Sequence, residues 1–173
     1  MNHIISNSKI DWIKVILGAA VIFSGLLAGQ TFDRYFVQFP SFKRLEIIYW
    51  ANYSRYADLG NGLILYPLEA IGSFLLVLIC TIMVWKDRMV LKPASLLIFA
   101  ALFLSLSGLV FTLLAAPVML SLKTMHNDPE LLQIAFHRFE YWGAYRGIAQ
   151  VLLFFVSVLA LLKIKPLETA SHS

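Results

Sequence analysis

Four stretches of this sequence are long and apolar enough to cross a lipid bilayer, and no other feature constrains the fold as strongly. A helix needs about 20 predominantly apolar residues to span the hydrocarbon core. Inside lipid the backbone must satisfy its own hydrogen bonds, which excludes open strands. The sequence therefore predicts an all-α polytopic membrane protein, a four-transmembrane-helix bundle that forms a single membrane domain over residues 1–173. Its expected spans are residues 12–29, 62–85, 94–122 and 143–162.

The composition supports a membrane class and argues against a nucleic-acid partner. Hydrophobic residues make up 60% of the chain and charged residues 14%, against about 45–50% and about 25% in soluble domains. The net charge is +4, but the Lys and Arg residues lie at the ends of apolar stretches, where the bilayer explains them. The expected partner is thus the lipid bilayer. The first apolar stretch is longer than the core of a signal peptide and is interpreted as a membrane anchor.

Charge density predicts the orientation. The N-terminal residues, the turn "KDRMVLK" (86–92) and the residues from 163 onward carry seven basic and three acidic residues. Seven basic residues also fall on the other side, but seven acidic ones offset them there and the connections are longer. Because Lys and Arg in short loops favour the cytoplasm, a multi-pass plasma (inner) membrane protein with both termini cytoplasmic is expected. Residues 166–173 are expected to be disordered.

The two longer connections, residues 30–61 and 123–142, are expected to be partly helical. In the first, Ser41 follows Pro40 and is a plausible N-cap. After it, apolar and aromatic residues recur at steps of three and four, which predicts an amphipathic helix. This helix either lies in the headgroup zone or extends the second span. The recurring residues are Leu45, Ile48, Tyr49, Tyr53 and Tyr56.

In the second connection, Asp128 is the expected cap of a helix with Pro129 at its first position. A helix from Pro129 to Leu162 would be about 51 Å long at 1.5 Å per residue, which exceeds the hydrocarbon core of about 30 Å. The fourth helix is therefore expected to project beyond the lipid and to carry the polar stretch "FHRFEYWGAYRGIAQ" (136–150) on its protruding turns.

The polar residues inside the spans mark the candidate site. Glu69 lies two turns into the second span, where a carboxylate is costly and usually faces the bundle interior. On the fourth helix Arg146 belongs to a stripe with a four-residue repeat, and we expect it to meet Glu69 or to flank a shared pocket with it. That arrangement is either a structural ion pair or a site in which Glu69 accepts a proton and Arg146 anchors an anionic ligand. The stripe consists of Arg138, Trp142, Arg146 and Gln150.

The candidate site residues follow from this reading. Glu69 is the catalytic candidate, and the ligand-binding candidates are Arg146, Trp142, Gln150, Tyr66 and His137. Trp142 is expected to turn inward as a wall for a flat hydrophobic ligand.

Neither a metal nor another cofactor is predicted. His137 and Glu140 are three residues apart, but metal-carboxylate bundles use the opposite order, Glu-x-x-His. His126, Asp128 and Glu130 could add ligands only if they converged with defined geometry. The single cysteine, Cys80, provides no metal or redox spacing.

Three stretches of the chain resemble the anthrone-oxygenase-like family of small four-helix membrane proteins. They are "GLLAGQTFDRYFVQFPSF" (25–42), "RYADLGNGLILYPLEAIG" (55–72) and "FHRFEYWGAYRG" (136–147). By position, Trp142 and Arg146 match the family's Trp and Arg at the head of the last helix, whereas Gly143 stands where Asn often follows the Trp. The resemblance implies oxygenation of polycyclic phenols, in some members without an obvious metal or flavin.

Two functions from different classes remain open at this point. The chain is either an oxidoreductase that binds and oxidises a flat lipophilic phenol or quinol, or a non-catalytic accessory or structural subunit of a membrane complex. A homo-oligomer is compatible with both. A transporter ranks last, because four spans without internal repeats are few for alternating access.

Overall fold

The computed structural model describes residues 7–85 and 91–164, and these residues form helices and no strands. The "KDRMVLK" turn therefore lies mostly outside the described residues, and the tail 166–173 lies wholly outside them. Two of the helical segments, η1 and η2, are wound as π-helices. In chain order the elements are α1 (Asn7–Asp33), η1 (Arg34–Gln38), α2 (Phe39–Arg44), α3 (Ile47–Tyr53), η2 (Ser54–Asn61), α4 (Gly62–Trp85), α5 (Lys92–Ser121) and α6 (Pro129–Lys163).

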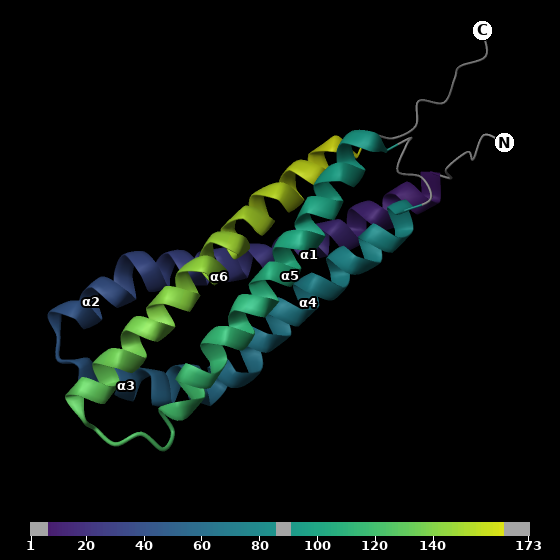
Figure 1. Ribbon diagram of the computed structural model, residues 1–173. Coiled ribbons are helices and arrows are strands. Elements are labelled where there is room, and N and C mark those ends of the chain that lie inside the picture. The colour runs from purple at the N-terminus through teal and green to yellow at the C-terminus, as the bar shows by residue number, and fades with distance from the viewer. Residues whose placement is uncertain (1–6, 86–90, 165–173) are drawn as a thin grey trace, which may run out of the picture.

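Four helical segments are long and apolar enough to cross a membrane, which confirms the predicted all-α four-helix membrane bundle. They run up and down, so that α1 begins and α6 ends at the same end of the bundle (Figure 1). We call this end the terminal end, and the opposite one, where α2 and α3 lie, the α2–α3 end. The candidate spans are Ser8–Arg44, Ile47–Trp85, Lys92–Ser121 and Pro129–Lys163.

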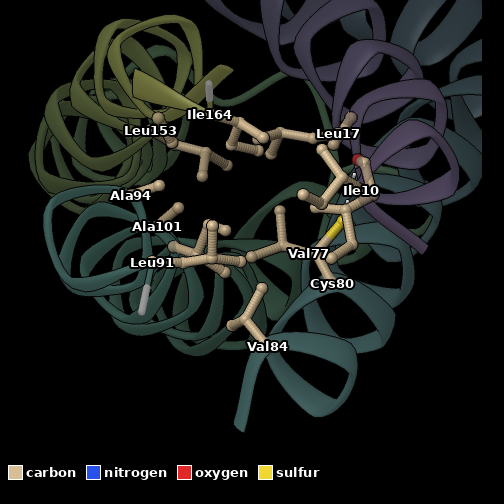
Figure 2. Close-up of a cluster of buried hydrophobic side chains, with 14 residues drawn as sticks. Ile10, Leu17, Val77, Cys80, Val84, Leu91, Ala94, Ala101, Leu153 and Ile164 are labelled. Carbon is tan, nitrogen blue, oxygen red and sulfur yellow. Dashed lines mark hydrogen bonds between the residues drawn. The ribbon is translucent and has the colours of Figure 1, made fainter. Parts of the chain in front are cut away.

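The half of the bundle at the terminal end is held together by an apolar cluster, which we call the terminal core. It includes Ile13 and Leu17 of α1, Val77 of α4, Ile98 of α5 and Ala160 of α6, all with no exposed area. Figure 2 shows its side chains meeting between the helices. These contacts come from all four long helices, so this half is packed as one unit.

The other half is closed at the α2–α3 end by a cluster rich in aromatic rings, which we call the aromatic cap. Trp50 of α3 is 1% exposed, and its ring lies 5.1 Å from that of Phe136 on α6. Phe39 of α2 contacts Phe136 and Phe139 edge to face, at centroid distances of 5.4 and 6.3 Å. The long α6 therefore projects far enough to anchor both short helices.

The first connection differs from its prediction at Ser41, which does not begin a helix. The first long helix continues through η1 and α2 to Arg44, and the Ser41 hydroxyl donates to the Val37 carbonyl oxygen, 2.7 Å away. Proline normally breaks a helix because it lacks an N–H and crowds the preceding turn. Here the turn just before Pro40 is wound as a π-helix, so its backbone hydrogen bonds do not follow the α-helical pattern. The Phe39 N–H donates to the carbonyl oxygen of Arg34, five residues earlier.

The chain reverses at Leu45 and Glu46, whose backbones are extended, and α3 then begins at Ile47. Of the two alternatives for the next helix, the structure has the second, because α3, η2 and α4 form one helical path with a break at Gly60. The buried face is Trp50, Ala51 and Ser54, whereas the predicted tyrosine stripe points mainly outward.

The predicted start of the last helix is confirmed. Asp128 has an extended backbone, and its carboxylate accepts hydrogen bonds from the backbone N–H groups of Glu130 and Leu131 at 2.9 and 3.3 Å. Pro129 occupies the first turn, where its missing N–H costs nothing.

Replacing Asp128 with alanine is therefore expected to lower the free energy of unfolding by about 1 kcal/mol, the usual cost of losing an N-cap. Equilibrium unfolding in mixed micelles would measure this loss. Asn at the same position keeps the acceptor and is expected to retain most of the stability, and equal losses for Ala and Asn would contradict the capping role.

Candidate functional site

A cavity of about 160 Å³ lies in the half of the bundle near the α2–α3 end. Its walls come from α1, η1, η2, α4, α5 and α6, so residues from every candidate span meet there. Every lining element contributes at least one polar side chain, but all the charged side chains belong to η1, η2 and α6. The residues contributed by α5 are mainly apolar or small. The cavity thus has one charged side and one apolar side.

An ion pair joins the two π-helical segments at the cavity. The Arg34 guanidinium of η1 lies 2.5 Å from the Asp58 carboxylate of η2, and both side chains are nearly buried. The Tyr66 hydroxyl of α4 donates to the same carboxylate at 3.3 Å. Short π-helical segments often occur at functional sites, and here η1 and η2 each hold one partner of the pair.

Arg146 of α6 lines the same cavity and is half-buried. Within residues 7–85 and 91–164 it has neither an ion pair nor a hydrogen bond, and its recorded ring contact is with Phe139, 5.6 Å from the guanidinium carbon. It is near enough to Arg34, Tyr35 and Asp58 to interact with them electrostatically. The charged lining side chains are therefore two guanidinium groups and one carboxylate.

Close packing of α1 on α6 brings these groups together. A Cβ added at Gly147 would lie 2.7 Å from the Thr31 methyl carbon, and one at Gly143 would lie 2.7 Å from the Tyr35 hydroxyl oxygen. That hydroxyl instead donates to the Glu140 carbonyl oxygen at 3.0 Å. The two glycines thus allow the helix contact that sets the position of Arg146.

One turn deeper, two hydrogen-bonded pairs replace the expected link between Glu69 and Arg146. The Gln30 amide donates to the Glu69 carboxylate at 2.8 Å, and the Thr31 hydroxyl donates to the Gln150 amide oxygen at 2.8 Å. Glu69 is buried, as expected, but it turns toward α1 and does not line the cavity. The expected direct pairing with Arg146 is wrong, because Gln30 satisfies the carboxylate and Asp58 provides the carboxylate of the site.

The structure separates the other candidate residues into two groups. Tyr66 and Gln150 line the cavity together with Arg146. Trp142 does not line it; its ring lies 5.0 Å from that of Tyr141, and it packs on the aromatic cap. His137 is exposed, bonded to the Gln133 amide at 2.8 Å and 3.8 Å from the Glu140 carboxylate. Trp142 lies between the lining residues Phe139 and Gly143 on α6, so its side chain is on another face of the helix at the level of the cavity. His137 lies on the exposed surface of α6.

Potential metal ligands do not converge in the described part of the chain, where no group of three or more His, Cys, Asp or Glu side chains could hold an ion. Glu140 instead pairs with Lys43 at 2.5 Å and ties α2 to α6.

Sequence reasoning missed Arg34 and Asp58, the central ion pair. Both were assigned to the connection 30–61, because the first apolar window ends at Gly29. One signal was available: Gln30 and Arg34 are four residues apart and continue the helical period of the first span, which predicts a shared face. The π-helical winding has no comparable sequence signature.

Comparisons with protein-family models, with curated protein sequences and with solved structures found no significant match to this chain. The candidate function therefore depends on the chemistry of the cavity alone.

Proposed function

We propose that the cavity binds the ring of a lipophilic phenol or quinol and that Arg146 holds its oxygen. The observation that carries this proposal is the guanidinium of Arg146, which reaches a largely apolar cavity with no protein acceptor among the described residues. A buried charge is costly unless it is paired and hydrogen-bonded. A ligand oxygen that accepts hydrogen bonds from the Arg146 guanidinium would remove this cost. A negatively charged oxygen would do so more effectively than a neutral one.

The size of the cavity favours a single ring. An apolar cavity of about 150 Å³ binds benzene, and the present one is about 160 Å³. A fused polycyclic phenol, which the family resemblance implies, is larger than benzene and would extend out of a cavity of this volume. Phe139 and Leu27 provide apolar walls for the ring, and Tyr66 offers a hydroxyl at its edge.

Replacing Arg146 with alanine is expected to weaken binding of a monocyclic quinol about tenfold to a hundredfold. A hydrogen bond to a charged group contributes about 1.5–3 kcal/mol, and each 1.4 kcal/mol changes the affinity tenfold. Equilibrium binding to the purified protein in nanodiscs, at fixed lipid composition, would measure the effect.

Arg138 provides the matched control, because it lies two turns away on the same helix, is exposed and does not line the cavity. Arg138→Ala should bind the quinol as the wild type does. Equal losses in both variants would indicate a general effect of surface charge, and a wild type without any quinol binding would overturn the proposal.

Oxygen uptake during the same experiment separates a catalytic role from a non-catalytic one. Oxidation would transfer two electrons and two protons from the quinol to dioxygen, yielding a quinone and hydrogen peroxide. Uptake that depends on Arg146 supports an oxidoreductase. Binding without uptake supports a ligand-binding accessory subunit of a membrane complex.

We also propose that the α2–α3 end is extracytoplasmic and that the terminal end faces the cytoplasm of a plasma (inner) membrane. The support is the excess of basic over acidic residues near the terminal end. Cysteine labelling on intact cells tests this orientation. In a Cys80→Ser background, the variants Asn52→Cys and Lys163→Cys each carry a single cysteine. Of the two, only Asn52→Cys should react with a membrane-impermeant maleimide.

A further inference from the structure

The cavity has one side where its lining reaches the outside of the protein, and that side lies between α4 and α5. Of all the lining residues, the exposed ones are Leu63 and Pro67 of α4 and Leu120 of α5. Leu63 is 40% exposed and Leu120 44%. The lining residues contributed by α1, η1, η2 and α6 are all buried or half-buried. The opening is therefore lateral and has apolar edges.

The two ends of the cavity are covered. Toward the α2–α3 end, Leu59, Met119 and Phe139 line the cavity and also belong to the aromatic cap. Toward the other end, the bundle is filled by the terminal core, and no residue of that core lines the cavity. A ligand of ring size thus meets packed side chains along the bundle axis in both directions.

The surface around the opening is suited to lipid rather than water. Ile64 and Leu68 on α4, and Leu113 on α5, are 75%, 61% and 71% exposed. The one charged residue of α4 is Glu69, which is buried, and α5 has none after Lys92. Such a surface is stable only against hydrocarbon, since exposed apolar area in water is unfavourable.

We infer that the ligand enters from the bilayer between α4 and α5, and that it is a monocyclic phenol or quinol bearing an apolar tail. This inference rests on the proposed function and adds the tail and its route. The ring occupies the cavity of about 160 Å³, with its oxygen at Arg146. The apolar tail is too large for the cavity and passes out of it between Leu63 and Leu120. Outside, the tail lies among lipid acyl chains, so that none of its apolar area is exposed to water.

Photochemical cross-linking would locate the tail. The probe is a 4-alkylphenol with a dodecyl chain that ends in a diazirine, added to the protein in nanodiscs. Peptide mapping should find the label on α4 and α5, close to the opening, and excess unlabelled alkylphenol should suppress it. Suppressible labelling of α2, α3 or the aromatic cap would show that the tail leaves toward the α2–α3 end and would overturn the inference.

Narrowing the opening provides an independent measurement. Because Leu63 lines the cavity at its opening, Leu63→Trp should weaken binding of the dodecyl phenol at equilibrium at least tenfold more than it weakens binding of the tail-less 4-methylphenol. Leu68→Trp makes the same change on the same helix at a residue that does not line the cavity, and it should bind both probes as the wild type does.

The outcomes distinguish the two proposals. If 4-methylphenol binds and depends on Arg146, but Leu63→Trp affects both phenols equally or neither, the proposed function stands and the tail route is wrong. If the wild type binds neither phenol, the proposed function fails, and the inference fails with it.

Discussion

Asp58→Ala is expected to lower the free energy of unfolding by about 3–5 kcal/mol, the cost of removing one partner from a buried ion pair. The Asp58 side chain is 5% exposed, and that of Arg34 is 11% exposed. Without the carboxylate, Arg34 and Arg146 would be two guanidinium groups lining one cavity. Tyr66 would also lose the acceptor of its hydroxyl. Equilibrium unfolding in mixed detergent micelles, followed by far-ultraviolet circular dichroism, would measure the change.

Two further variants test this explanation. Asp33→Ala removes a carboxylate that is exposed and bonded to Gln38, and it should cost less than 1 kcal/mol, as expected for a surface interaction. The double variant Arg34→Met with Asp58→Leu replaces the pair with apolar groups and should be more stable than Asp58→Ala alone. A double variant as unstable as the single one would show that the ion pair does not explain the loss.

Trp50→Ala is expected to cost about 3–5 kcal/mol, as large-to-small changes at buried aromatic residues do. The indole is the largest fully buried side chain among the described residues, and it contacts Phe136 and Phe139 of α6. Its removal would leave a void between α3 and α6, at the point where α3 holds η2 against the bundle. We therefore expect quinol binding to weaken as well, because Asp58 and Leu59 of η2 line the cavity.

The neighbouring residue supplies the control for this prediction. Tyr49→Ala removes a large aromatic side chain from the same helix, but Tyr49 is 55% exposed. It should change the free energy of unfolding by less than 1 kcal/mol and leave quinol binding unchanged. Alanine has a higher helix propensity than either aromatic residue, so similar losses for both variants would mean that the buried packing of Trp50 does not explain the loss.

The helices were largely predictable because hydropathy and capping are local properties. The span 62–85 coincides with α4, and Asp128 with Pro129 marks the first turn of α6. These features depend on nearby residues alone, since each membrane helix satisfies its backbone internally.

The site was predictable only in part, because partner choice depends on helix rotation and winding. Arg146, Gln150 and Tyr66 were placed correctly at a shared cavity. Glu69 was expected to meet Arg146 or to flank a shared pocket with it, yet it faces α1, accepts a hydrogen bond from Gln30 and does not line the cavity. The carboxylate that does line the cavity is that of Asp58. It belongs to a π-helical segment that is broken at Gly60, and helical periodicity does not describe such a path.

The terminal core has a consequence for the membrane as an electrical insulator. The charged side chains that line the cavity, those of Arg34, Asp58 and Arg146, lie in one half of this bundle, where a polar cavity can hold water. The other half presents tightly packed hydrocarbon from all four long helices, with Ile13, Leu17, Val77 and Ile98 having no exposed area. Among the described residues, the side chains of that layer carry no charge. The charged groups of the cavity can therefore lie in one half of a bilayer while the other half remains a hydrocarbon barrier to ions.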